Sequence, residues 1–313
     1  MKSAGNIKWL GVVPALALVA LLLAAAPAGA SVPSRSAATT IYKHVEADEK
    51  VLAGWTGSTA SCTVGTESQA SIDATLDAVN GYRQFAGVKT VTLNPQFNQA
   101  ALAAATAMQA AGRLDHDIGP DFPCYSQEAA DGAAHSNLAL GLSGAKAIEA
   151  YMGEEGDLGH RRYVLFPGQI EIGTGSTGGA NAMYVIGGEL DGSRVVEVPD
   201  DSKVAWPSAG WFPTPWAYET ETWSVSLGSY DTQDAIDASR AKVHLKIDGK
   251  KAAVKDVTEL GTEYGMGKPL TWQLKKRSLI KKGDHKIAVK ITGVTLDGKP
   301  FPVSYKTKAF DPR

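Results

Sequence analysis

Two histidines stand at the ends of predicted helical segments, close to acidic residues and glycines. His116 follows Leu114 and Asp115 at the end of an alanine-rich segment, and His160 follows Gly159 in the run GHRRYVLFP. Neutral imidazoles are frequent zinc ligands, and imidazoles also transfer protons near neutral pH. These two residues therefore predict a functional site that acts by metal binding or by acid–base chemistry.

Three helices are predicted around these histidines. Residues 70–86 carry apolar side chains at helical spacing, with Ser71 placed to cap the helix and Gly87 to end it. Residues 94–111 repeat the pattern, with Pro95 in the first turn and Gly112 after the last. A third helix is predicted over 143–155, and 171–175 and 182–188 read as a strand pair joined by a glycine-rich turn.

The second half of the chain has the pattern of a small antiparallel sandwich. Short alternating runs predict strands at 223–227, 241–247, 270–274, 285–291 and 302–310. Asp248-Gly249 and Asp297-Gly298 are hairpin turn pairs. Before these runs, Trp206, Trp211 and Trp216 lie in a proline-rich segment that fits neither a regular helix nor a central strand. We expect the tryptophans to pack between domains, the alternative being stacking on sugar rings or lipid.

The N-terminal region predicts export. Met1–Ala30 has a basic start, an apolar stretch and a small-residue cleavage site, so it reads as a signal peptide, with an uncleaved anchor as the alternative. Ser31–Gln69 is rich in small polar residues and is predicted to be an extended arm. Export favours a disulfide between the two cysteines, Cys62 and Cys124. A catalytic or metal-binding thiol is the weaker alternative, because neither cysteine lies in a CxxC motif.

The mature chain has an acidic N-terminal region and a basic C-terminal region. Residues 31–237 hold 11 Lys and Arg against 26 Asp and Glu, whereas residues 238–313 hold 18 against 7. Export argues against nucleic acid as a partner. The lysines alternate with apolar residues, as on the solvated face of a sandwich. They could instead hold the protein against an anionic wall polymer or membrane surface, or dock on the acidic first domain.

Two enzyme motifs do not predict a site in this sequence. Residues 173–178 satisfy GxGxxG, but a strand-like run follows where a dinucleotide site needs a helix. No GxSxG nucleophile elbow is present. The sequence therefore gives no motif-based support for nucleotide binding or serine hydrolysis.

The front half resembles the CAP superfamily of cysteine-rich secretory proteins, antigen five and pathogenesis-related proteins, particularly its bacterial SCP-like branch. The resemblance covers residues from about 72 to 188. The matching residues are Asn80-x-x-Arg83, Gly87, Leu93-Asn94, Leu114-Asp-His116, Gly159-His160-Arg161, Leu165 and Ile172-Gly-Thr-Gly175. The resemblance implies an α+β chain, with a CAP-type α-β-α sandwich followed by the small antiparallel β-sandwich. It also implies that both histidines face one cleft.

In that family the cleft typically holds two histidines and two glutamates, and some members bind zinc or another divalent cation there. The resemblance therefore implies His116 and His160 as metal ligands and Glu154 as one acid. The second acid is absent, because the family's Gly-Glu-Asn motif reads His135-Ser136-Asn137 in this sequence. His135 and Asn137 complete the cleft residues that we expect.

The predicted organisation is a signal peptide (1–30), an extended arm (31–69), a CAP domain (70–192), a Trp/Pro-rich connector (193–220) and a β-sandwich (221–313). We expect an exported, non-enzymatic protein that binds a ligand or envelope component, such as a lipid, sterol or wall polymer, through the cleft. One alternative is a metal-dependent hydrolase that uses the two histidines, with Glu154 as base. The other is an adhesion or scaffold protein that acts through the β-sandwich.

Overall fold

The computed structural model describes residues 32, 34–154, 156–187, 196–263, 265 and 267–313. The predicted signal peptide, Met1–Ala30, lies outside the described residues, as do residues 188–192 of the predicted CAP region and 193–195 of the connector. In the described part of the chain, no helix combines the length and the apolar character that crossing a membrane requires.

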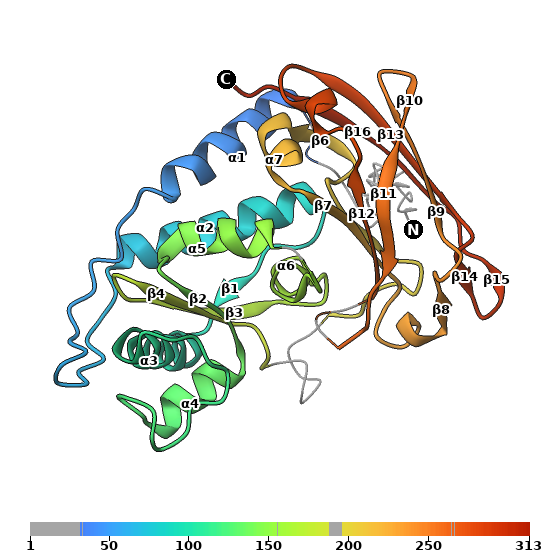
Figure 1. Ribbon diagram of the computed structural model, residues 1–313. Helices are drawn as coiled ribbons and strands as arrows, with labels where there is room; N and C mark the ends of the chain where they lie inside the picture. The colour runs from blue at the N-terminus through green and yellow to red at the C-terminus, as the bar shows by residue number, and fades with distance from the viewer. Residues whose placement is uncertain (1–31, 33, 155, 188–195, 264, 266) are drawn as a thin grey trace, which may run out of the picture.

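A four-stranded sheet with helices on both faces forms the first half of the molecule (Figure 1). The sheet order is β1 (Thr92–Leu93), β3 (Glu171–Ser176), β4 (Ala180–Tyr184) and β2 (Ser136–Leu140). One face carries α2 (Gln69–Ala86) and α5 (Gly144–Gly153), with α1 (Arg35–Asp48) packed on α2; the other carries α3 (Pro95–Ala111) and α4 (Gln127–Ala134). The short helix α6 (Gly159–Val164) lies beside α5, next to the second half of the molecule. The predicted α-β-α sandwich is confirmed.

The two long predicted helices are present, and their capping residues are as predicted except at the start of α2. The side chain of Asn94 accepts from the backbone N–H of Gln96 and caps α3, and Gly112 ends α3 in the left-handed conformation. Gly87 ends α2 in the same way, at φ 73°. The cap of α2 is Ser68, which accepts from the N–H of Ser71, and not Ser71 itself as predicted.

The arm predicted to be extended from Ser31 to Gln69 contains a helix instead. Ser34 caps α1 by accepting from the N–H of Ala37, and the buried residues Ala38, Tyr42 and Val45 form one apolar stripe of the helix. The stripe packs on α2 and on the aromatic cluster that contains Trp216. The tertiary partner therefore decides this helix, because the stripe has nothing to bury in the isolated segment.

Glycines allow α3 to lie directly on the sheet. A Cβ added to Gly175 would be 2.1 Å from the backbone nitrogen of Leu102, and one added to Gly173 would be 2.4 Å from the carbonyl carbon of Phe97. Both glycines belong to β3, and β4 follows them without a helix. Glycines of the rejected GxGxxG run thus serve close packing of α3 on the sheet.

Two facing sheets form the second half, the predicted β-sandwich (Figure 1). One sheet has the order β10 (Lys250–Ala252), β9 (Lys242–Ile247), β13 (His285–Thr292), β16 (Val303–Phe310) and β6 (Gly210–Pro213). The other has the order β11 (Val254–Glu259), β12 (Lys268–Leu274), β7 (Thr222–Leu227) and β5 (Lys203–Trp206). All pairs are antiparallel except β6, which runs parallel to β16.

Buried aromatic and aliphatic residues such as Trp223, Trp272 and Val289 fill the space between the two sheets. A minor sheet of β8 (Ile236–Asp237), β14 (Thr295–Leu296) and β15 (Lys299–Pro300) and the 3₁₀ helices Gln233–Ala235 and Arg277–Ile280 complete this half. The predicted turn pairs are present, with Asp248, Gly249, Asp297 and Gly298 all at positive φ.

The Trp/Pro-rich connector is more regular than predicted. It contributes the edge strands β5 and β6, where proline is tolerated, and the short helix α7 (Thr214–Glu219), whose first turn holds Pro215. Trp206 and Trp216 are buried between the two halves, and the Trp216 ring lies 4.6 Å from that of Tyr82 on α2. These two tryptophans confirm the expected packing between domains.

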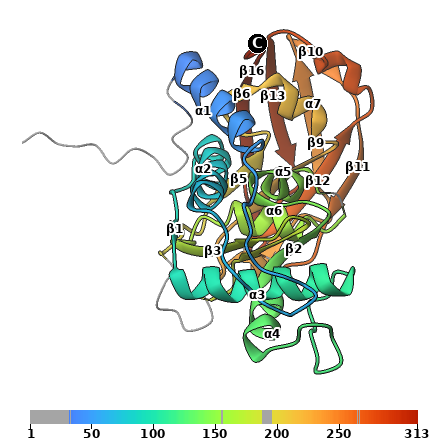
Figure 2. The ribbon, with the colours of Figure 1, turned by 90° about the vertical axis from the view of Figure 1, so that its left-hand side faces the viewer.

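The predicted disulfide between Cys62 and Cys124 is present, with 5.0 Å between the two Cα atoms. It joins the segment between α1 and α2 to the loop between α3 and α4, as Figure 2 helps to follow. The link therefore connects segments that lead to opposite faces of the four-stranded sheet.

Candidate functional site

His160 is held at the beginning of α6 by Glu154. Its Nδ1 lies 3.1 Å from Oε1 of Glu154, and its backbone N–H donates to Oε2 of the same carboxylate at 2.8 Å. Leu158, which precedes α6, adopts the left-handed conformation at φ 59° and turns the chain into the helix. The structure thus brings together two of the predicted cleft residues. Glu154 uses both carboxylate oxygens on His160, which fits an orienting role better than that of a free base.

Asn137 is connected to the same group. Its Nδ2 donates to the backbone carbonyl of His160 at 3.0 Å, and its own carbonyl accepts from the hydroxyl of Tyr151. The ring of Tyr151 lies 5.0 Å from that of His160. The ring and hydroxyl of Tyr151 thus help to position the histidine.

His116 lies against the C-terminal end of α4. Its Nδ1 is 2.9 Å from the carbonyl oxygen of Ala133, and the residue is exposed. A carbonyl oxygen only accepts, so this contact places a proton on Nδ1 and leaves Nε2 with the lone pair in the neutral ring. Nδ1 of His160 faces a carboxylate in the same way, and such a contact favours Nε2 as the ligating nitrogen.

His135 caps the end of α4, two residues beyond the carbonyl that binds His116. Its Nδ1 lies 2.8 Å from the carbonyl oxygen of Asp131 and 3.3 Å from its Oδ1, and its ring stacks on Tyr184 at 5.3 Å. The hydroxyl of Tyr184 donates to Oδ2 of Asp131. The ring is thus held by its own helix and by Tyr184.

Ser136 stands where the family motif has glutamate. It is buried, and within the described part of the chain its Oγ has no hydrogen-bond partner. The expected second acid is thus replaced by a buried hydroxyl.

The described residues contain one group of three His, Cys, Asp or Glu side chains whose ligand atoms lie within 4.8 Å of one another. This group is His44, Asp48 and Asp77, on α1 and α2. It includes neither His116 nor His160, so the metal site implied for those two histidines stays a prediction.

The two arginines after His160 bind the two halves of the molecule together. Arg161 is buried and donates to the carbonyl oxygens of Met152, Glu154 and Thr222. Arg162 donates to the carbonyl oxygen of Gly267 at 2.9 Å. The helix that presents His160 is therefore attached to the β-sandwich by its next two residues.

Arg83 of the Asn80-x-x-Arg83 match has a structural role. Its guanidinium donates to the carbonyl oxygens of Lys89, Val164, Phe166 and Gln169, which joins α2 to the segment before β1 and to the end of α6 and the loop that follows it. Burial lowers the pKa of Arg83 to about 9. We assign this residue to the support of the fold.

A second candidate surface lies on the β-sandwich. A groove of about 680 Å³ runs over the exposed face of the β9–β13–β16–β6 sheet. Its lining includes Trp211, Lys246, Lys286, Lys306 and Lys308. The four lysines are exposed, and in the described part of the chain none of them has a carboxylate within 4.0 Å.

The register of the paired strands places these four lysines on one sheet face. Lys286 is directly opposite Lys308, while Lys246 and Lys306 flank Ala288. The alternating lysines were visible in the sequence, but which of them share one groove depends on strand pairing. The same holds for Trp211, which β6 places beside Lys308 at the edge of the sheet.

Comparison with known proteins identifies a family in the first half of the chain. No curated protein matches the chain. Among solved structures, the chain is similar to a 1.5 Å crystal structure of an extracellular protein containing a SCP domain from Bacillus anthracis str. Ames, at 15% identity and a TM-score of 0.31. The similarity covers 37% of this chain and 40% of that one. Residues 76–187 match the family model CAP, described as the cysteine-rich secretory protein family. The chain thus contains a CAP domain over residues 76–187, joined to a C-terminal β-sandwich.

Proposed function

We propose that this protein is exported and attaches, without catalysis, to an anionic polymer of the cell envelope through the lysine groove of its β-sandwich. The observation that carries the proposal is the set of four exposed lysines on one sheet face. Neighbouring strands lie about 5 Å apart and alternate residues about 7 Å apart, so the ammonium groups form a compact positive surface. Such a surface attracts a chain of closely spaced anionic groups.

Repulsion within the groove favours an anionic occupant. Lys286 and Lys308 form a directly opposed pair of like charges, an arrangement that destabilises an antiparallel ladder. The carboxylates of the groove are already engaged: Asp248 accepts from His285 and from the N–H of Lys286, and Asp284 pairs with Arg35. A phosphate or carboxylate of the polymer between Lys286 and Lys308 would relieve their repulsion.

Trp211 adds a surface for a sugar or polyol. Its ring is half-buried at the edge of the groove, and Nζ of Lys308 lies 5.0 Å from the ring centroid. Aromatic faces stack on the C–H faces of sugars, and the adjacent ammonium can bind an anionic substituent of the same repeat. An anionic glycan or polyol phosphate therefore fits this pair better than a simple anion does.

Export rests on two features. The first 30 residues read as a signal peptide, and the one disulfide belongs to a class of bond that persists in oxidising compartments. Both agree with an envelope polymer as the partner.

The test is binding of residues 31–313 to immobilised poly(glycerol phosphate) lipoteichoic acid, with neutral mannan as the uncharged control. We expect saturable binding that weakens steeply with salt, and a loss of about tenfold or more in the double variant K286Q/K308Q, because each lost contact removes charge attraction. The matched control K275Q/K276Q removes two exposed lysines outside the groove. Equal affinity of the two double variants would reject the groove as the binding surface.

A second candidate function is binding of zinc or another divalent cation by His116 and His160. The contacts that engage the Nδ1 atoms of both rings favour it, because they leave the Nε2 atoms for a metal. Titration calorimetry of zinc into residues 31–313, H116A and H160A tests it. Loss of one binding event in both variants supports a joint site, and unchanged titrations contradict it.

A further inference from the structure

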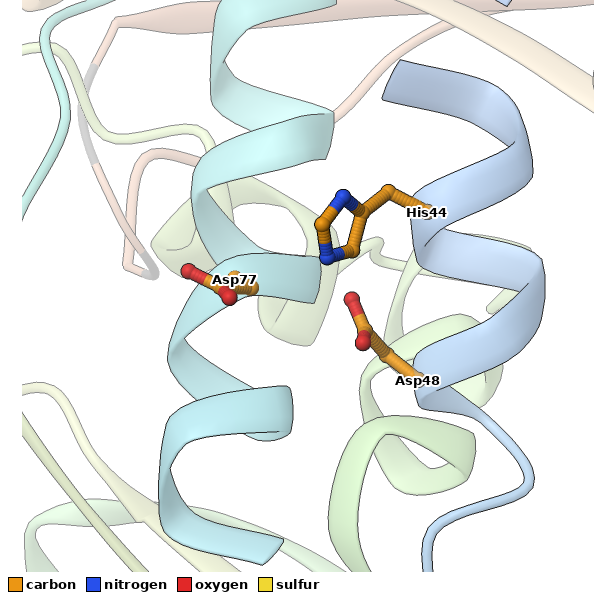
Figure 3. A group of neighbouring side chains, drawn as sticks. All are labelled: His44, Asp48 and Asp77. Atoms are coloured by element: carbon orange, nitrogen blue, oxygen red, sulfur yellow. The ribbon is translucent and has the colours of Figure 1, made fainter. Parts of the chain in front are cut away.

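Helices α1 and α2 place three metal-ligating side chains together outside the CAP-matched cleft residues (Figure 3). His44 and Asp48 are four residues apart on α1, so they lie on one face of that helix. Asp77 belongs to the adjacent helix α2, and Figure 3 shows it across from His44 and Asp48, whose side chains lie next to each other on α1. Their ligand atoms lie within 4.8 Å of one another.

The carboxylate of Asp48 gives a second, independent indication of a bound cation. The residue is only 8% exposed, and in the described part of the chain its Oδ2 has no hydrogen-bond partner. Burial raises the pKa of Asp48, with His44 acting in the opposite direction. A buried carboxylate oxygen without a partner is unfavourable unless a cation or donor compensates for it.

The structure offers no other strong cation for this pair of acids. Among the described residues, neither Asp48 nor Asp77 has a lysine or arginine nitrogen within 4.0 Å. His44 is exposed and is the single basic residue of the group.

The backbone that carries the ligands is well fixed. A Cβ added to Gly81 of α2 would lie 2.6 Å from Cγ2 of Val45, so this glycine allows α1 to approach closely. Arg35 at the start of α1 pairs with Asp284 of the β-sandwich, and Tyr42 packs on Trp216. The three ligand positions are thus set by packing that does not involve a metal.

We propose that His44, Asp48 and Asp77 bind a zinc ion that joins α1 to α2. One imidazole and two carboxylates are common zinc ligands and leave a fourth tetrahedral position for water, whereas Ca²⁺ requires six or more oxygen ligands. Three atoms that all lie within 4.8 Å of one another have a common point no more than about 2.8 Å from each. Side-chain shifts of less than about 1 Å therefore reach the roughly 2.0–2.2 Å bonds of zinc. The ion fastens the helix that precedes the CAP match to the first helix of the α-β-α sandwich.

Zinc titration of residues 31–313 and of two ligand variants, H44Q and D77N, tests the proposal. Both substitutions are at exposed positions, so they preserve the fold, which circular dichroism verifies. D73N is the matched control, because Asp73 is also an exposed carboxylate of α2 and lies outside the group. We expect H44Q and D77N to lose one saturable zinc-binding event, and D73N to keep it.

Thermal unfolding provides the second measurement. A ligand that binds only the native state raises Tm, so zinc should raise the Tm of the parent protein and of D73N but not that of D77N or H44Q. The variant H116A/H160A separates this site from the cleft: it should retain the binding event and the Tm increase. The proposal is overturned if H44Q and D77N titrate like the parent, or if the zinc-dependent Tm increase disappears in H116A/H160A alone.

Discussion

The guanidinium of Arg161 donates to the carbonyl oxygen of Thr222 at 2.7 Å, so the helix that presents His160 is bonded to the first residue of β7. Arg161 also donates to the carbonyls of Met152 and Glu154. One buried side chain thus connects the end of α5, the backbone of Glu154 and the β-sandwich.

Replacing Arg161 with methionine should lower the free energy of unfolding by about 3 kcal/mol or more, because several buried carbonyl oxygens lose their donor. Urea denaturation measures this change. R113M is the control, since Arg113 is exposed and contacts the ring of Phe122 from the surface. Similar stability of the two variants would show that the Arg161 contacts contribute little.

Replacing Glu154 with alanine should destabilise α6. The carboxylate accepts from the N–H of His160, one of the first N–H groups of that helix, and the loss of such an acceptor costs about 1 kcal/mol. E154Q keeps an oxygen acceptor and should stay closer to the parent. Chemical denaturation of both variants checks the order, and an E154A protein as stable as E154Q would contradict the orienting role.

Removing the disulfide should destabilise the protein by about 4 kcal/mol in the chain-entropy model for a loop of this length. Cys62 and Cys124 are separated by 62 positions. The variant C62S/C124S should therefore unfold at lower urea concentration than the oxidised parent. The parent measured under reducing conditions should shift by a similar amount, and coincidence of all three curves would rule the contribution out.

The carboxyl of Glu67 should make stability fall as pH rises. Burial raises its pKa above the ordinary 4.5, although Ser71 and the N–H of Ser176 donate to it. The folded state therefore binds this proton more tightly than the unfolded state does. The resulting stabilisation is complete below about pH 4.5 and is lost as pH rises through the folded-state pKa.

In E67Q this contribution disappears, so the stability of the parent relative to E67Q should decline as pH rises from 4.5, the ordinary glutamate pKa, through the raised pKa of the folded state. Denaturation midpoints of both proteins across that range measure it. E128Q, which changes an exposed carboxylate of α4, should follow the parent. A constant difference between parent and E67Q would mean that Glu67 titrates alike in both states.

Local features of the fold follow from the sequence alone. Asn94, Pro95 and Gly112 placed α3 to within one residue, because a side-chain cap, a proline in the first turn and a left-handed glycine act within one helical turn. The paired residues Asp248-Gly249 placed a hairpin turn for the same local reason. The disulfide followed from the presence of two cysteines in a chain predicted to be exported.

Tertiary structure decided the features that depend on distant partners. Helix α1 forms because α2 and Trp216 cover its apolar stripe. These partners are not visible in the isolated segment, and for that reason the sequence predicted an extended arm. Strand register selects which lysines meet in one groove, and the packing of two helices brings Asp77 to His44 and Asp48. In each case residues far apart in the sequence meet only after the chain has folded, so local spacing in the sequence does not predict their contact.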